Sequence, residues 1–120
     1  MPFPVTEDRV AAAEAELGRR LPESLRGHLL QSNGGEVEAA GDVWQLHPVW
    51  DPSDRKRAGR TANHIVGETA RAREWPGFPG GAISVAANGS GDHLILESGG
   101  DAFALWDHET GTVEPIDVEF

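Results

Sequence analysis

The sequence ISVAANGSGDHLILESGGDAFALWD, residues 83–107, decides the fold. It contains short apolar segments rich in Ile, Val, Leu and aromatic residues, and turns of Gly, Ser, Asn and Asp separate them. Segments of this kind, joined by such turns, are typical of antiparallel strands that follow one another in sequence order. The stretch therefore predicts a β-meander with strands at 83–87, 93–97 and 102–107.

Further strands are expected on both sides of this meander. Residues 36–50 are β-branched and aromatic in short segments, broken by Gly41 and Pro48, and predict one or two strands. A turn around Thr110-Gly111 leads to another strand at 112–114. The predicted sheet therefore has about five or six strands.

The N-terminal part of the chain has the signals of a helical hairpin. Thr6 is placed as the N-cap of a first helix that ends near Gly18. Pro22 suits the first position of a second helix, and Asn33-Gly34-Gly35 suits a left-handed cap at its end.

One further helix is expected in the middle of the chain. Residues 51–60 are interpreted as a loop, and apolar residues at helical spacing predict a helix from about Ala62 to Trp75, which Pro76 ends. The fold class is therefore α+β. At 120 residues, with no linker or repeat, residues 1–120 are expected to form a single domain.

Composition excludes several classes of protein. The chain has no cysteine, which rules out disulfides, thiolate zinc sites, iron–sulfur clusters and a cysteine nucleophile. No apolar run approaches the length of a membrane span, and the first residues lack the apolar stretch of a signal peptide. We expect a soluble, cytoplasmic protein that does not bind a membrane.

The charge is strongly acidic and unevenly distributed. The formal net charge is −10, and residues 74–120 contain nine acidic residues but no lysine or arginine. Such a charge repels nucleic acid and attracts cationic partners. The basic residues of 55–73 are interpreted as a solvated loop and helix face, so no nucleic acid is expected as a partner.

Two motifs resemble ligand sites but are incomplete. Residues 88–92, Asn-Gly-Ser-Gly-Asp, are glycine-rich like a phosphate or calcium loop, but a strand follows them and no lysine is near. His108-Glu109 begins like a zincin motif, but Thr112 stands where the second histidine ligand is required. Both are interpreted as turns, and no metal or cofactor is expected.

A small set of polar and aromatic residues stays open to a functional role. Asp92 and Asp107 are able to meet across neighbouring strands, and with His108 they would supply a small hydrolase, the third-ranked hypothesis. Trp44 and Trp106 are expected in the core. Two further tryptophans that flank loops, Trp50 and Trp75, are candidate anchors for a partner.

Several of these residues occur together, in the same order, in a known family. They are Glu14, Leu17-Gly18, Leu21-Pro22, Leu29, Asn33-Gly34-Gly35, the turn Asn88-Gly89-Ser90-Gly91-Asp92, and Trp106-Asp107-His108-Glu109 before Gly111. With them, the chain resembles the SUKH superfamily over residues 6–111. The basic stretch 55–60 and the segment around Trp44 and Trp50 are not signature features of that superfamily.

The resemblance implies a fold, a class of function and a partner. The superfamily contains the fungal Smi and Knr cell-wall assembly regulators and many bacterial immunity proteins that neutralise polymorphic toxins, a number of which are nucleases. It implies an α+β fold, with Asp92 capping backbone N–H groups of its own turn. We expect a non-enzymatic immunity protein whose partner is a basic toxin domain; the alternative is an intracellular regulatory or scaffolding protein of the Smi/Knr type.

The acidic last third of the chain supplies most of the expected contact residues, because its turns place carboxylates near loop tips. No catalytic residue is expected. The expected partner-binding residues are Asp92, Asp101, Asp107, Glu109 and Trp50.

Overall fold

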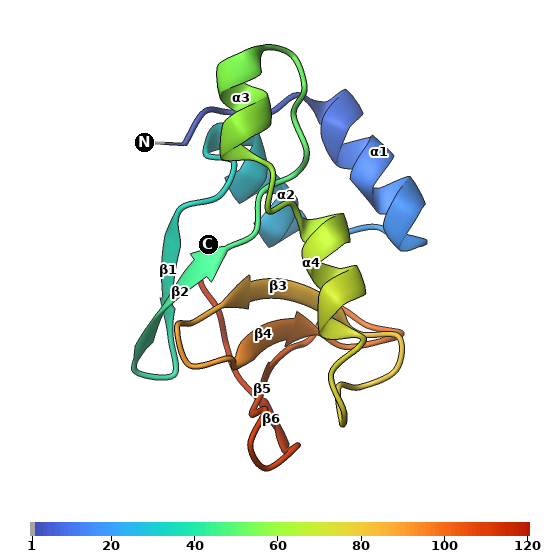
Figure 1. Ribbon diagram of the computed structural model, residues 1–120, viewed down its shortest axis with the longest axis vertical. Helices are drawn as coiled ribbons and strands as arrows, with labels where there is room; N and C mark the ends of the chain where they lie inside the picture. The colour runs from blue at the N-terminus through green and yellow to red at the C-terminus, as the bar shows by residue number, and fades with distance from the viewer. Residues whose placement is uncertain (1) are drawn as a thin grey trace.

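The computed structural model describes residues 2–120, and these form an α+β fold, which confirms the predicted class (Figure 1). The helices of this part of the chain are α1 (Glu7–Leu17), α2 (Glu23–Gln31), α3 (Arg55–Arg60) and α4 (Ile65–Ala72). The strands are β1 (Glu36–Ala39), β2 (Asp42–Leu46), β3 (Ile83–Ala87), β4 (His93–Leu96), β5 (Phe103–Trp106) and β6 (Val113–Pro115).

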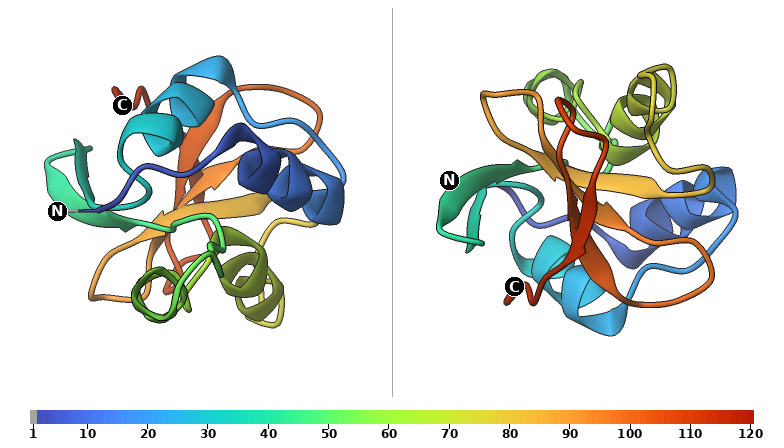
Figure 2. Two further views of the ribbon diagram at one scale, coloured as in Figure 1. Left: turned by 90° about the horizontal axis from the view of Figure 1, so that it is seen from above. Right: turned by 90° about the horizontal axis from the view of Figure 1, so that it is seen from below.

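The strands form one antiparallel sheet in sequence order, β1-β2-β3-β4-β5-β6. The predicted meander is therefore confirmed, and residues 36–50, for which one or two strands were expected, contain the two strands β1 and β2. Figure 2 shows that the sheet is strongly twisted, with α2 on one side of the central strands and α3 and α4 on the other. α1 contacts both α2 and α4, and α4 packs on β3.

The central strands are buried on both faces, which explains why their sequences are nearly continuous apolar runs. All four residues of β4 are buried. Leu94 and Leu96 join the main core, whereas Ile95 joins a smaller cluster with Trp106 on the opposite face. Trp44 lies in the main core and Trp106 in the smaller cluster, so both tryptophans predicted to be in the core are buried.

The helical hairpin forms as predicted, but the start and the end of α2 each differ from the prediction by one or two residues. Gly18 ends α1 with a left-handed φ of 80°, and Thr6 stands at the N-cap position. Pro22 is the N-cap of α2 and not its first helical residue, because its ψ of 149° is extended. Ser32 ends α2 in an extended conformation, and the left-handed residue, Gly34 at φ 119°, comes two residues later.

The prediction of a loop at 51–60 is wrong, because residues 55–60 form α3. The Asp54 side chain caps this short helix by accepting a hydrogen bond from the backbone N–H of Arg57, 2.7 Å away. The next helix is shorter than predicted. It begins after His64, whose ring accepts from the Gly67 N–H, and it ends at Ala72.

A chain of buried polar side chains links α4, β3, β4 and the residue that follows β2. The Ser84 hydroxyl lies 2.9 Å from His47 Nε2 and 2.7 Å from His93 Nδ1, and Thr69 Oγ1 accepts a hydrogen bond from the Ser84 backbone N–H. Burial lowers the pKa of His47 to about 4 and also lowers the pKa of His93. Both imidazoles are therefore neutral at pH 7.

Candidate functional site

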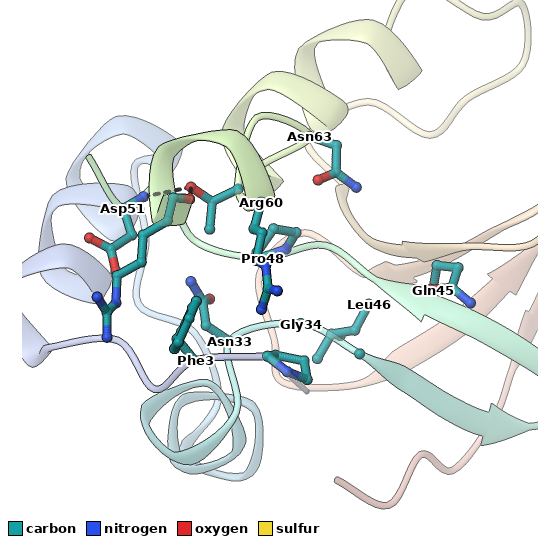
Figure 3. Close-up of a pocket in the computed structure, with 13 residues that line it drawn as sticks. Phe3, Asn33, Gly34, Gln45, Leu46, Pro48, Asp51, Arg60 and Asn63 are labelled. Carbon is teal, nitrogen blue, oxygen red and sulfur yellow. Dashed lines mark hydrogen bonds and ion pairs between the residues drawn. The ribbon is translucent and has the colours of Figure 1, made fainter. Parts of the chain in front are cut away.

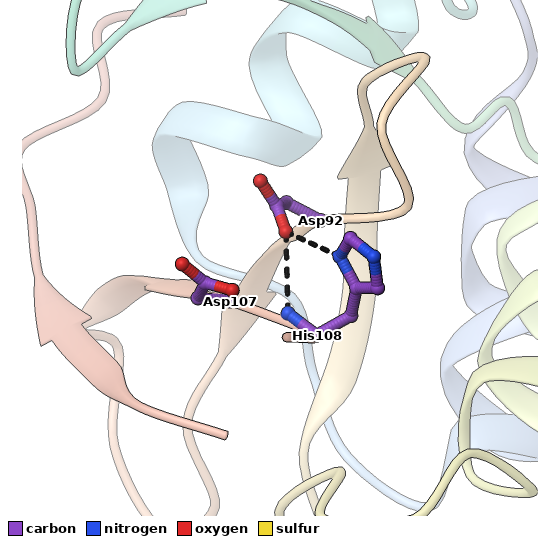
Figure 4. A group of neighbouring side chains, drawn as sticks. All are labelled: Asp92, Asp107 and His108. Atoms are coloured by element: carbon purple, nitrogen blue, oxygen red, sulfur yellow. Dashed lines mark hydrogen bonds and ion pairs between the residues drawn. The ribbon is translucent and has the colours of Figure 1, made fainter. Parts of the chain in front are cut away.

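A cluster of acidic residues and a histidine lies at one end of the meander. β4 and β5 pair with His93 opposite Trp106, so the turn before β4 and the turn after β5 lie side by side. This register brings Asp92 beside Asp107 and His108, as the sequence predicted for the two carboxylates (Figure 4). We call Asp92, Asp107, His108 and Glu109 the acidic end of the sheet.

Asp92 and His108 form a tight pair within this acidic end. Asp92 Oδ1 accepts hydrogen bonds from the His108 backbone N–H at 3.2 Å and from His108 Nδ1 at 2.7 Å. The hydrogen bond from the His108 ring lowers the pKa of Asp92, and the Asp92 carboxylate raises the pKa of His108. Gly91 makes room for the ring, since a Cβ there, at φ 96°, would lie 3.3 Å from it.

The expectation that Asp92 caps its own turn is wrong. The cap of that turn is Asn88, whose side-chain oxygen accepts from the backbone N–H groups of Ser90 at 3.0 Å and Asp92 at 3.1 Å. Asp92 does not, because its carboxylate is held by the neighbouring hairpin.

Asp107 organises the turn between β5 and β6. Its Oδ1 accepts from the backbone N–H groups of Glu109 at 2.8 Å and Thr110 at 3.3 Å, and this arrangement leaves the Glu109 side chain exposed. Within residues 2–120, no lysine or arginine lies within ion-pair distance of Asp107 or Glu109. Neither carboxylate is therefore paired with a lysine or arginine of this part of the chain, and Glu109 is exposed to solvent.

The acidic end offers ligand atoms but is already hydrogen-bonded internally. One ligand atom each from Asp92, Asp107 and His108 lies within 4.8 Å of the others. However, Asp92 Oδ1 and His108 Nδ1 are engaged with each other. The pair has the geometry of a general base and its orienting carboxylate, which is the feature that the hydrolase hypothesis would use.

An exposed tryptophan lies next to the acidic end. The Trp75 ring is 6.3 Å from the His108 ring, centroid to centroid, at 75°, and Trp75 is 53% exposed. Beneath this region, Trp106 Nε1 donates to the Gly77 carbonyl at 3.1 Å, which fixes the segment after Trp75 to the sheet. The sequence identified Trp75 as a candidate anchor, but no spacing pattern placed it beside these acids.

The remaining predicted contact residues lie elsewhere. Asp101 is in the turn between β4 and β5, at the opposite end of those strands, and its carboxylate is 3.1 Å from Arg19 Nη2. Trp50 is 40% exposed and packs beside His64, with 5.7 Å between ring centroids. The five residues therefore do not form one surface.

The fold and the site define a small α+β protein with an exposed acidic turn at one end of its sheet. A comparison with family models identifies the particular family: residues 4–120 match the SMI1 / KNR4 family (SUKH-1), nearly the whole chain. The chain belongs to this family, which confirms the resemblance seen in the sequence. A search of curated proteins found no match. None of the helices formed by residues 2–120 is both long and apolar enough to span a membrane.

Proposed function

We propose that this protein is a non-enzymatic immunity protein that neutralises a cognate toxin, and that the acidic end contacts a basic surface of that toxin. One observation carries the proposal: Glu109 is exposed at a turn that the half-buried Asp107 organises, beside the exposed Trp75. Membership of the SUKH-1 family supports a role in protein binding.

The charges of this surface suit rapid capture of a cationic protein. A net charge of −10 steers a basic partner toward the molecule and raises the association rate at low salt. Trp75 adds a large apolar side chain whose face attracts a lysine or arginine of the partner. A tryptophan that becomes buried in an interface contributes a large share of the binding free energy in many complexes, mostly by slowing dissociation.

The Ser84 hydroxyl, which is hydrogen-bonded to His47 and His93, is not accessible to a substrate. Ser84 bonds to His47 and His93, which resembles an activated nucleophile, but its side chain is fully buried beneath the sheet. A substrate would have to displace the core to reach it. This argues against Ser84 as a nucleophile.

The test takes the gene next to this one. If it encodes a toxin domain, the two proteins are co-expressed to measure protection, and their association is followed by stopped flow at two salt concentrations. Glu109→Lys should slow association about tenfold at low salt and much less at high salt. Trp75→Ala should speed dissociation about tenfold or more. Asp101→Lys, an equal charge change at the other end of the strands, is the matched control.

Specific outcomes would count against this proposal. If Asp101→Lys slows association as much as Glu109→Lys, net charge matters and the acidic end is not the contact surface. If the neighbouring gene encodes no toxin, or if it encodes one and co-expression of this protein does not protect cells from it, the regulatory role of the Smi/Knr type replaces immunity. Binding at rates indifferent to salt would also contradict the electrostatic argument.

A further inference from the structure

The sheet has two edge strands, β1 and β6, and they differ in how they would receive another strand. On β6, Ile116 donates a hydrogen bond to the Phe103 carbonyl. Bonded pairs alternate along an antiparallel ladder, so the neighbouring Pro115 turns its backbone nitrogen away from the sheet. Proline has no N–H, and another strand therefore lacks a hydrogen-bond donor at this position of β6.

The β1 edge offers backbone donors and acceptors along its outer side. Leu46 donates to the Gly35 carbonyl at 2.8 Å, which fixes the alternation of the β1–β2 ladder. The register turns the N–H and C=O groups of Glu36 and Glu38 away from β2. Within residues 2–120, no hydrogen-bond partner reaches these outward groups. Figure 1 shows β1 at the outer margin of the fold, where another strand would have to approach.

The side chains along this edge are acidic and lack a cation. Glu36 and Glu38 are exposed on the same face of β1. Val43 of β2 lies opposite Glu38 on that face and is 46% exposed. Gln45 Nε2 donates to the Glu36 carboxylate at 2.9 Å, but no lysine or arginine of residues 2–120 lies within ion-pair distance of either glutamate. The edge therefore combines uncompensated negative charge with an apolar side chain.

The basic residues of α3 gather elsewhere. Arg57 Cζ and Arg60 Cζ lie 4.2 Å and 4.9 Å from the centroid of the Phe3 ring. They border a hollow of about 330 Å³ between the N-terminal segment, the end of β2 and α3. Figure 3 shows the Arg60 side chain apart from Gln45, the residue that bonds to Glu36. The cations of α3 therefore do not neutralise the β1 edge.

We propose that the outer side of β1 binds an extended basic segment of a partner protein, which joins the sheet as a further strand with lysine or arginine opposite Glu36 and Glu38. Backbone hydrogen bonds to a sheet edge supply affinity for an extended chain, and alternate side chains supply specificity. The Cβ atoms of residues directly opposite each other on neighbouring strands are about 4.5–5.5 Å apart, so opposite charges at these positions attract. The exposed Val43 gives the aliphatic part of a lysine or arginine side chain an apolar surface to cover.

The same charges argue against other occupants of this edge. A second copy of the chain that paired through its own β1 would place glutamates opposite glutamates, and like charges directly opposite each other destabilise a sheet. Nucleic acid would be repelled by these carboxylates and by the net charge of −10. Glu36 and Glu38 therefore protect the edge from self-association while they select a cationic strand.

The test is a ¹H–¹⁵N NMR titration of the intact protein with the capped peptide acetyl-KVKVK-amide. One comparison peptide has the same sequence with N-methylated lysine backbones, so it keeps the charge but cannot donate the strand hydrogen bonds. The other, acetyl-QVQVQ-amide, keeps those hydrogen bonds but has no charge. We expect saturable shifts at the backbone amides of Glu36 and Glu38, and each comparison peptide should bind about tenfold more weakly.

A charge reversal and its matched control locate the binding surface. Glu38→Lys should lower the affinity about tenfold, because it replaces attraction by repulsion. Glu114→Lys makes the same charge change at an exposed residue of β6, the other edge strand, and should lower the affinity less than about threefold.

Several results would overturn this proposal. They are equal losses from Glu38→Lys and Glu114→Lys, undiminished binding of either comparison peptide, and the absence of saturable shifts at Glu36 and Glu38. Protection of these two amides from hydrogen exchange that rises with protein concentration, without peptide, would assign the edge to a second copy and overturn it too. Neither the toxin nor the acidic end is used, so this result is independent of the proposed immunity function.

Discussion

Lowering the pH should destabilise this protein through the buried His47. His47 is 4% exposed, and burial holds its pKa near 4, below the ordinary value of 6.5. As the pH falls below 6.5, the unfolded chain takes up a proton at this position while the folded chain does not. The stability contributed by neutral His47 is therefore fully present above pH 6.5 and is lost progressively down to about pH 4.

The size of the loss follows from proton linkage. Each pH unit within this window costs about 1.4 kcal/mol, so the free energy of unfolding should fall by about 2 kcal/mol between pH 8 and pH 5. By pH 4 the loss from His47 alone should reach about 3 kcal/mol. Burial lowers the pKa of His93 as well, so its contribution has the same sign. A small domain has about 5–15 kcal/mol in total, so the effect is large enough to measure.

The assay is urea denaturation of the wild type, His47→Gln and His108→Gln at pH 8 and pH 5. In His47→Gln the fall in unfolding free energy should be smaller by about 2 kcal/mol. His108 is the matched control, because Asp92 raises its pKa and its stabilising effect is present at low pH and lost as pH rises through that pKa. Its removal should leave the acid loss in place or make it steeper. Equal losses in the wild type and His47→Gln would refute the reasoning.

Three further predictions concern single residues. Asp92→Asn should lower the pKa of His108, because the hydrogen bond that the ring donates to that carboxylate is the main cause of its rise, and an NMR titration of the ring would show it. Gly34→Ala should cost about 1–2 kcal/mol because φ is 119°, whereas Gly27→Ala, a helical site with open space for a Cβ, should stabilise by up to about 1 kcal/mol; thermal or urea denaturation compares the two. Glu14→Gln should cost about 2 kcal/mol in the same assay, since its buried carboxylate accepts from a backbone N–H at 2.7 Å and from a guanidinium at 3.1 Å.

The sheet could be predicted from the sequence because its evidence is local. Apolar runs separated by glycine-rich turns specify a meander without knowledge of any distant contact. α3 could not be predicted in the same way. Its residues have no apolar spacing, and what lies against it is Phe3, more than fifty residues earlier in the chain. Such a contact has no signature in a short window of sequence, so the segment was interpreted as a loop.

The candidate site was predicted in part for the same reason. The meeting of Asp92 with Asp107 follows from the antiparallel pairing of two adjacent strands. The exposed Trp75 comes from the connection after α4, and its place beside His108 depends on how that connection folds over the sheet. The choice of Trp50 as an expected contact residue stays a prediction.

The fold leaves some acidic residues of the last third of the chain without a nearby cation, and these are the residues that a cationic partner would contact. The last third of the chain has no lysine or arginine, so its acids are compensated only from other parts of the fold, and Arg19 does this for Asp101. At the acidic end, the carboxylates of Asp107 and Glu109 keep their charge beside Trp75. Charges are screened over about 8–10 Å in physiological salt. A partner that binds at one of the two turns, that of Asp101 or that of Glu109, is therefore influenced mainly by the charges of that turn. Asp101→Lys and Glu109→Lys change the net charge by the same amount, so any difference between their association rates measures where the partner binds.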